Sequence, residues 1–271
     1  MKIAWILLAA SVLGFICSGC DVNPVTGQEE FLLVSPAQEK KMGLDASAQV
    51  EKELGQSVQD QQLQNYISSV GHKIAAVCHT PNEEFSYKAI DHKSVNAFAL
   101  PGGYIYITTG LLKVLNSEAQ LAAVLAHETA HVTARHIAQQ ITRDFIINAG
   151  ITVASTQVPS PAMRVAGIVK QLEGMSFTRE QERQADEVGL NYIVIAGYTP
   201  YGMVETMEIL ERQSESGQIE FLSTHPNPEH RVEYIKQDII KKDYIIYGKT
   251  GRKGEAEYKS NVSDRLVPWG K

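Results

Sequence analysis

The stretch His127-Glu128-Thr129-Ala130-His131 places two histidines four residues apart, with a glutamate directly after the first. An α-helix turns by about 100° per residue, so the two imidazoles lie about 40° apart on one face. In that arrangement both can bind one Zn²⁺ ion, and Glu128 is close enough to act as a general base on a water molecule beside it. The alternative is a chance match of five letters, against which the flanking sequence argues.

The sequence around this motif predicts a buried helix from Glu118 to about Ile141. Ser117-Glu118-Ala119-Gln120 has the form of a capping box, and neither Gly nor Pro occurs within the predicted helix. Ionisable side chains in a core helix need a partner, and a bound metal would supply one for two histidines at once. Ten small or aliphatic residues make the helix apolar nearly all round: Leu121, Ala122, Ala123, Val124, Leu125, Ala126, Ala130, Val132, Ala134 and Ala138.

The sequence has no third histidine in the metzincin position. In the pattern HExxHxxGxxH, the glycine and the last histidine would fall at Ala134 and Ile137. On a continuous helix His136 lies about 180° from His127, so we do not expect it to bind the same ion. We interpret His136 as a residue that lies behind the ligands or at the surface.

A second predicted helix carries the acidic residues from which a third ligand can come, and a catalytic zinc site usually has three protein ligands. The helix begins at the capping-box sequence Thr178-Arg179-Glu180-Gln181 and should run to about Ala196, with Gly197 as its stop. Glu182 and Asp186 lie along its apolar stripe, where an unpaired carboxylate is costly.

We therefore expect Glu182 to be the third metal ligand. Asp186, one turn further on, is expected to accept a hydrogen bond from a ligand histidine and so to fix its tautomer. The alternative for Asp186 is an internal salt bridge, for instance with Arg135 or Arg179. Glu180 and Glu187 lie on the opposite side of the helix and are expected to face solvent.

Four motifs occur in this order: Asn96-Ala97-Phe98-Ala99-Leu100-Pro101-Gly102-Gly103, His127-Glu128-x-x-His131, Glu182-x-x-x-Asp186, and His225-Pro226 followed by Arg231. In this the chain resembles the HExxH metallopeptidases that include the type I CAAX prenyl endopeptidase, HtpX and a branch of periplasmic lipoprotein proteases. The resemblance covers most of the mature chain. It implies an α+β fold, a mostly helical gluzincin-type zincin with a small mixed β-sheet beside the HExxH helix.

The resemblance also implies roles for individual residues. His127, His131 and Glu182 would bind one Zn²⁺ per chain, and Glu128 would be the catalytic base. An edge strand beside the zinc would pair with an extended substrate, and we assign it to Asn96, Ala97, Phe98 and Ala99. The alternative is an ordinary hairpin strand that fills the core.

His225 lies on a predicted loop between helices that begin near Thr199-Pro200 and Asn227-Pro228. It would either stabilise the oxyanion or occupy the water position in a resting state. A histidine that caps local structure is the alternative. Arg231 is expected to orient a carboxylate of the site or of the substrate.

The remaining elements predict one core of helices and strands. We expect helices from Ser35 to near Gly55 and from about Gln61 to Val77, and strands over Phe85–Asp91, Val95–Ala99 and Tyr104–Thr108. The apolar run 145–154 is about half of what a bilayer needs and precedes a Pro-rich break at 158–161. We interpret 144–175 as a helical hairpin that either forms a lid or dips into the membrane surface.

The first residues resemble a bacterial lipoprotein leader. A single charge, Lys2, precedes an apolar run from Ile3 to Ile16 and the small-residue sequence Cys17-Ser18-Gly19-Cys20. We expect cleavage before Cys20 and its acylation, although Cys17 stands where a lipobox usually has Leu. The alternative is an uncleaved signal anchor. Asp21 resembles an inner-membrane retention signal, which leaves inner and outer membrane both open.

The predicted organisation is therefore a signal peptide (1–19), a membrane tether (20–34), one metallopeptidase domain (35–246) and a peripheral C-terminal tail (247–271). Acylation of Cys20 leaves Cys78 as the one remaining thiol, so no internal disulfide is expected. Loss of Lys2 takes the formal net charge from −6 to −7, which argues against a nucleic-acid partner.

These features predict a lipid-anchored, periplasm-facing zinc endopeptidase of the bacterial cell envelope. The resemblance implies misfolded or damaged envelope proteins, in unfolded or extended form, as its substrates. One alternative is a chaperone-like assembly factor that binds envelope proteins with little proteolysis. Another is a metal-dependent amidase that acts on cell-wall peptide.

Overall fold

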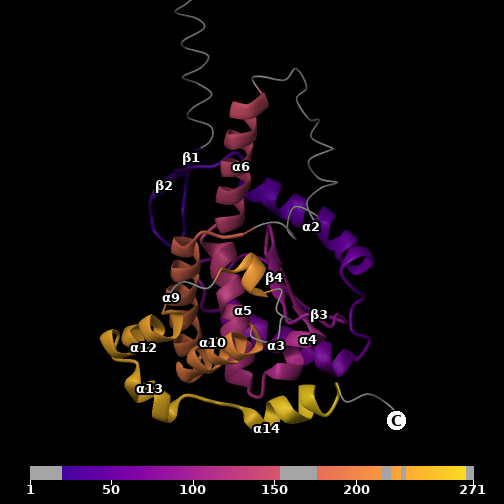
Figure 1. Ribbon diagram of the computed structural model, residues 1–271, viewed down its shortest axis with the longest axis vertical. Helices are drawn as coiled ribbons and strands as arrows, with labels where there is room; N and C mark the ends of the chain where they lie inside the picture. Colours follow the sequence, from indigo (N-terminus) through magenta and orange to yellow (C-terminus); the bar gives the residue numbers. More distant parts are fainter. Residues whose placement is uncertain (1–19, 153–175, 215–220, 227–229, 267–271) are drawn as a thin grey trace, which may run out of the picture.

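Helix α5 (Glu118–Thr133) lies at the centre of the molecule and carries the HExxH motif (Figure 1). The computed structural model describes residues 20–152, 176–214, 221–226 and 230–266. As predicted, α5 begins at an N-cap serine, since the Ser117 hydroxyl accepts a hydrogen bond from the Gln120 backbone N–H. Nearly every side chain of α5 is buried, which confirms the prediction of a core helix.

The described residues are mostly helical, with two small sheets, which confirms the predicted α+β class. The strands are β1 (Cys20–Val22), β2 (Glu29–Phe31), β3 (Ser86–Ile90), β4 (Ala97–Leu100) and β5 (Tyr104–Thr108). The helices besides α5 are α2 (Pro36–Glu53), α3 (Gln61–Ala75), α4 (Thr109–Val114), α6 (His136–Thr152), α9 (Arg179–Ile195), α10 (Tyr201–Ser214), α11 (Phe221–Thr224), α12 (Arg231–Lys241), α13 (Ile245–Thr250) and α14 (Glu255–Tyr258), followed by a π-helical turn, Lys259–Ser263.

The larger sheet is mixed and has the order β3-β5-β4. Strand β5 is parallel to β3 and antiparallel to β4, with Ala97 opposite Ile107. One face of the sheet, which includes Ala97 and Ile107, joins the main core around α5, and the other packs Tyr106 against α2. Within the described residues β4 has a strand neighbour on one side only, so it is an edge strand beside the HExxH helix.

The turn between β4 and β5 needs glycine at two positions. Gly102 and Gly103 have positive φ angles of 73° and 92°. A Cβ atom at Gly102 would lie 2.5 Å from the Lys40 Cα atom of α2, so the turn also allows α2 to approach the sheet closely. The predicted strands and helices here agree with the structure to within about three residues at each end.

The HExxH helix does not continue to Ile141 as predicted. It ends at Thr133, and a separate helix, α6, begins at His136. Arg135 between them has a positive φ of 56°. Its guanidinium forms ion pairs with Asp21 and with Glu39, the latter at 2.7 Å, so contacts distant in sequence stabilise a break that local propensity does not signal.

Residues 20–31, which lie within the predicted membrane tether (20–34), form a folded hairpin of β1 and β2. The strands pair in antiparallel fashion, with Cys20 opposite Phe31. The Asn23 side chain between them is buried and donates a hydrogen bond of 2.9 Å to the Ala134 carbonyl. The hairpin is thereby fixed to the junction of α5 and α6.

The C-terminal segment is not peripheral, contrary to expectation. Tyr258 and Val262 are fully buried in the main core, and the Tyr258 hydroxyl donates to the Leu112 carbonyl at 2.7 Å. Arg252 binds the buried carboxylate of Glu118 at 2.9 Å, at the first turn of the HExxH helix. The tail therefore helps to hold the start of α5.

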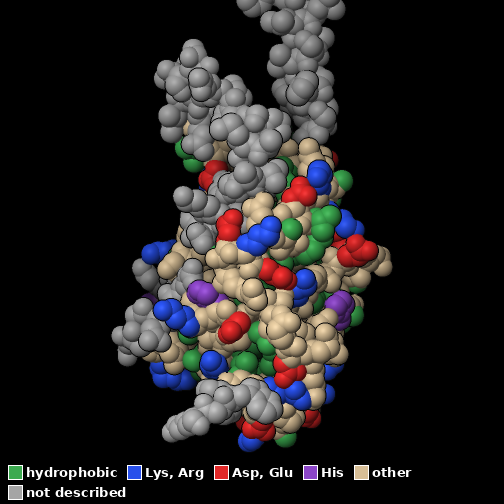
Figure 2. Space-filling model, turned by 90° about the vertical axis from the view of Figure 1, so that its right-hand side faces the viewer, with side chains coloured by type: hydrophobic (Ala, Val, Ile, Leu, Met, Phe, Trp, Pro, Cys, Tyr) green, Lys and Arg blue, Asp and Glu red, His purple; other side chains and the backbone are tan. Residues whose placement is uncertain are grey.

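Some predictions lie outside the described residues: the leader (1–19), the break at 158–161 and the helix start at Asn227-Pro228. None of the helices in the described ranges is long and apolar enough to cross a membrane. Cys78 is a buried residue of the core. On the face drawn in Figure 2, acidic and basic side chains are interspersed.

Candidate metal centre

Helix α9 lies against α5 and brings the two predicted acidic residues to the two histidines. Its start at the Thr178 capping box and its end at Gly197, which has a φ of 86°, agree with the prediction. The helices approach closely at Gly189, where an added Cβ atom would lie 3.2 Å from the His127 backbone nitrogen. Glu182 and Asp186 are fully buried, whereas Glu180 and Glu187 are exposed, as predicted.

Four donor atoms from three helical segments converge next to Glu128. His127 Nε2 lies 3.1 Å from His131 Nε2 and 3.3 Å from His225 Nδ1. Glu182 Oε1 lies 3.3 Å from His131 Nε2 and 3.0 Å from His225 Nδ1. All four residues are buried, and among the described residues they form the one group with the geometry to hold a metal ion.

These residues fit a zinc ion in chemistry and in size. Tetrahedral zinc with ligand distances of about 2.0–2.1 Å has ligand–ligand edges of about 3.3–3.4 Å, close to the distances found here. Glu182 Oε2 has no hydrogen-bond partner although it is buried. Nitrogen and oxygen lone pairs this close, in a site shielded from water, repel one another unless a cation lies between them.

The protonation of His131 and Glu182 suits a metal, whereas at His127 the effect of burial is outweighed by Asp186 and Glu182, which raise its pKa to about 9, so a metal has to displace a proton there. Burial lowers the pKa of His131 well below its ordinary value, which keeps the imidazole neutral. Burial alone would raise the pKa of Glu182, but the neighbouring histidines hold it well below its ordinary value. A neutral imidazole and an ionised carboxylate are the forms that bind zinc.

Asp186 lies behind His127, where the sequence predicted a hydrogen bond to a ligand histidine. Its Oδ1 is 3.0 Å from His127 Nδ1. Arg231 binds both oxygens of Asp186, at 2.6 and 2.7 Å, and the Tyr234 hydroxyl donates to Oδ2. The alternative for Asp186, an internal salt bridge, is therefore present as well, with Arg231 as the partner, whereas Arg135 pairs with Asp21 and Glu39. Tyr234 was not among the predicted site residues, since no motif marks it.

His136 lies behind the other histidine of the motif. Its Nδ1 is 2.9 Å from His131 Nδ1, and its Nε2 is 2.7 Å from the Gln184 side-chain oxygen. Burial lowers the pKa of His136 to about 4, so the ring is neutral. If its Nε2–H donates to Gln184, its Nδ1 accepts from His131, which leaves the His131 Nε2 lone pair directed at the centre. The break at Arg135 makes this contact possible.

Glu128 is fully buried, and neither of its carboxylate oxygens has a hydrogen-bond partner. Burial raises its pKa. Its Oε1 lies 3.6 Å from His225 Nε2, so the carboxylate is next to the four donors without being one of them. A buried, unsatisfied carboxylate in this position has the geometry to exchange a proton with a group at the centre.

His225 comes directly after the short helix α11, which was not predicted from the sequence, and contacts with this helix hold it in place. Its backbone N–H donates to the Phe221 carbonyl at 2.8 Å, and its ring stacks on the Phe221 ring with centroids 4.4 Å apart. The Phe221 N–H in turn donates to the Val95 carbonyl at 3.2 Å, just before β4. The segment that carries His225 therefore contacts the predicted substrate strand.

A sequence profile described as peptidase family M48 matches residues 61–239, a range that contains His127, Glu128, His131, Glu182 and His225. The chain belongs to peptidase family M48. The resemblance based on the four sequence motifs is thereby confirmed. Over 243 residues this M48 peptidase chain is 30% identical to the beta-barrel assembly-enhancing protease of Escherichia coli (strain K12), a match that covers 83% of this chain and 50% of that protein.

A eukaryotic relative matches as well. Over 223 residues the chain is 30% identical to the mitochondrial metalloendopeptidase OMA1 of Schizosaccharomyces pombe, covering 79% of this chain and 65% of that protein. This M48 peptidase chain spans about half the length of its bacterial relative. Both relatives are peptidases by name.

Proposed function

We propose that this protein is a zinc endopeptidase that cleaves unfolded or extended polypeptides of the cell envelope. The observation that carries the proposal is the convergence of His127, His131 and Glu182 beside the unpartnered carboxylate of Glu128. Membership of peptidase family M48 supports the same reaction class. Bound there by these three residues, one Zn²⁺ would polarise the scissile carbonyl. It would also lower the pKa of a water molecule, so that the water can attack this carbonyl near neutral pH.

Glu128 acts as the proton carrier in this proposal. Its oxygens accept no hydrogen bond from the protein, so they are available to take a proton from the attacking water and to deliver it to the leaving amine. Asp186 and Arg231 keep His127 in the tautomer whose Nε2 lone pair is directed at the centre. His136 does the same for His131.

His225 occupies the fourth corner of the donor set, the position that an active zinc peptidase leaves to water. We infer that the structure represents a resting state, and that His225 has to withdraw before a substrate binds. The backbone contact between Phe221 and Val95 supports this interpretation, because a polypeptide arriving along the edge of β4 meets the segment that carries His225.

The substrate class follows from β4. An edge strand can pair with the backbone of an extended chain whatever its sequence, which suits a protease of broad specificity. The name of the E. coli relative refers to β-barrel assembly, and we propose a related role in the quality control of envelope proteins. The lipobox-like sequence at Cys20 supports lipid anchorage facing the periplasm.

Metal analysis combined with casein cleavage tests this proposal. The wild type and the Glu180→Ala variant, a change at an exposed position of the same helix, should each contain one zinc and cleave casein. Glu182→Ala should lose most of its zinc and its activity. Full zinc content and cleavage in Glu182→Ala would overturn the ligand assignment.

A further inference from the structure

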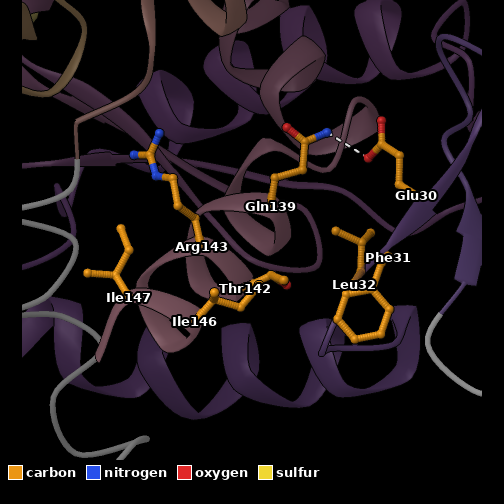
Figure 3. A pocket seen from close by; sticks show the side chains of 8 residues that line it. All are labelled: Glu30, Phe31, Leu32, Gln139, Thr142, Arg143, Ile146 and Ile147. Carbon is orange, nitrogen blue, oxygen red and sulfur yellow. Dashed lines mark hydrogen bonds between the residues drawn. The ribbon is translucent and has the colours of Figure 1, made fainter. Parts of the chain in front are cut away.

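A groove with a volume of about 490 Å³ lies between the N-terminal hairpin and helix α6, away from the metal centre. Phe31 and Leu32 form one side of the groove, and Thr142, Ile146 and Ile147 of α6 form the other (Figure 3). None of these residues takes part in the proposed reaction. The groove is therefore a feature that the peptidase activity does not explain.

The rim of this groove exposes several large apolar side chains. Phe31 is 47% exposed, and Ile146 and Ile147 are each 55% exposed. Val22, on the neighbouring strand, is 53% exposed, and Leu33 is 38% exposed. We call these five residues the apolar ridge. Isolated exposed apolar residues are common, but several of them on and beside one groove usually mark an interaction surface.

The apolar ridge is held in place by polar contacts beneath it. The Gln139 side chain of α6 donates to Glu30 of β2 at 2.8 Å, and the Leu33 backbone N–H donates to the Thr142 hydroxyl at 3.0 Å. Glu30 also accepts from Asn23 at 2.8 Å, so its carboxylate is satisfied within the protein. The surface is preformed, and covering it leaves no unpaired carboxylate at Glu30.

The position of Cys20 indicates what covers the ridge. Cys20 pairs with Phe31 across the hairpin, so the point where the N-terminal segment joins the described fold lies beside the groove. The preceding sequence is apolar from Ile3 to Ile16 and ends in the lipobox-like Cys17-Ser18-Gly19-Cys20. Whether Cys20 is acylated or the leader is retained as an anchor, the attachment to the bilayer starts next to the apolar ridge.

We propose that the apolar ridge docks on the bilayer surface as a second membrane contact, next to the N-terminal attachment. Val22 and Phe31 of the hairpin and Ile146 and Ile147 of α6 enter the boundary between headgroups and acyl chains. Because the hairpin is fixed to the junction of α5 and α6, docking sets the orientation of the metal centre relative to the membrane. This inference rests on the proposed membrane attachment and not on the peptidase activity.

Spin labels on the full-length chain in its membrane-bound form test the proposal. Ile146→Cys places a label on the ridge, and Ile240→Cys places one on α12, at the other end of the molecule (Figure 1). Ile240 is 63% exposed and serves as the matched control. The parent chain, treated with the same label, measures the background from native cysteines.

In vesicles of phosphatidylethanolamine and phosphatidylglycerol, the label at 146 should collide with oxygen and lose its accessibility to a water-soluble nickel chelate. The label at 240 should remain accessible to nickel. Adding Ile147→Asp to the first variant should restore nickel access at 146. Equal nickel access at 146 and 240 in chain that pellets with the vesicles would overturn the proposal, as would chain that fails to pellet. Casein cleavage, measured on the same samples, reports separately on the proposed function.

Discussion

Replacement of Asp186 by Asn tests how the structure prepares His127 to bind zinc. The carboxylate accepts from His127 Nδ1 at 3.0 Å and from Arg231 at 2.6 and 2.7 Å. Asn has nearly the same shape but no negative charge. Its NH₂ group cannot accept a hydrogen bond, so it would face the N–H group of His127 or of Arg231 without pairing. The substitution should therefore weaken zinc binding and also destabilise the fold.

Two magnitudes follow from these contacts. Loss of a partner that orients a ligand histidine typically lowers metal affinity by about 10- to 100-fold, or roughly 1.4–2.8 kcal/mol. Arg231 is 1% exposed, and its guanidinium would lose its closest carboxylate. Breaking a buried ion pair by removal of one partner costs about 3–5 kcal/mol. The free energy of unfolding of the metal-free protein should fall by that amount, less the share still supplied by Glu182 at 3.4 Å.

Zinc affinity can be measured by competition with a chelator, and stability by denaturant unfolding with the chelator in excess. Glu187→Gln is the control, because this adjacent carboxylate is 51% exposed and pairs with Lys242 at the surface. Tyr234→Phe keeps both charges, so it should fold, lose about 1.5–3 kcal/mol of stability and bind zinc nearly as well as the wild type. Zinc affinity in Asp186→Asn within threefold of the Glu187→Gln control would refute the reasoning.

Three further predictions concern other parts of the molecule. Burial raises the pKa of Glu39 from 4.5 to about 7, although its pair with Arg135 acts in the opposite direction. The folded state therefore binds this proton more tightly than the unfolded state does. The resulting contribution to stability is fully present below pH 4.5 and is lost as the pH rises through 7. The stability of the wild type relative to Glu39→Gln should fall by up to about 3 kcal/mol over that window, and parallel stability curves would contradict this. His225→Ala should retain zinc on three ligands and cleave casein faster than the resting wild type. Unchanged cleavage would contradict the proposal that His225 occupies the water position. Tyr258→Ala should lower the free energy of unfolding by about 3–5 kcal/mol, measured by denaturant titration, against less than 1 kcal/mol for a peripheral residue.

The parts of the structure that were predictable from sequence are those encoded by short-range patterns. The capping residues Ser117 and Thr178 mark two helix starts correctly because a cap acts within one turn. The burial of Glu182 and Asp186 followed from helical periodicity alone. The starts of both helices of the candidate metal centre and the presence of a strand at β4 were therefore predictable from such patterns, whereas the edge position of β4 was expected from the family resemblance.

The errors concern contacts between residues distant in sequence. The break at Arg135 depends on Asp21 and Glu39, more than 90 residues earlier, so no local pattern announces it. Asp21 belongs to the hairpin within the predicted tether, so its contact with Arg135 also holds this segment against the fold. The contact of His136 with His131 depends on that break. The burial of Tyr258 depends on contacts with segments far from it in sequence, such as its hydrogen bond to the Leu112 carbonyl.

The most direct test of the central claim is zinc content and casein cleavage of Glu128→Gln. The change replaces one carboxylate oxygen by an amide group and leaves His127, His131 and Glu182 intact. We predict one zinc per chain, as in the wild type, with cleavage lower by at least about 100-fold, the usual contribution of a general base. Cleavage at the wild-type rate by the zinc-loaded variant would contradict the account.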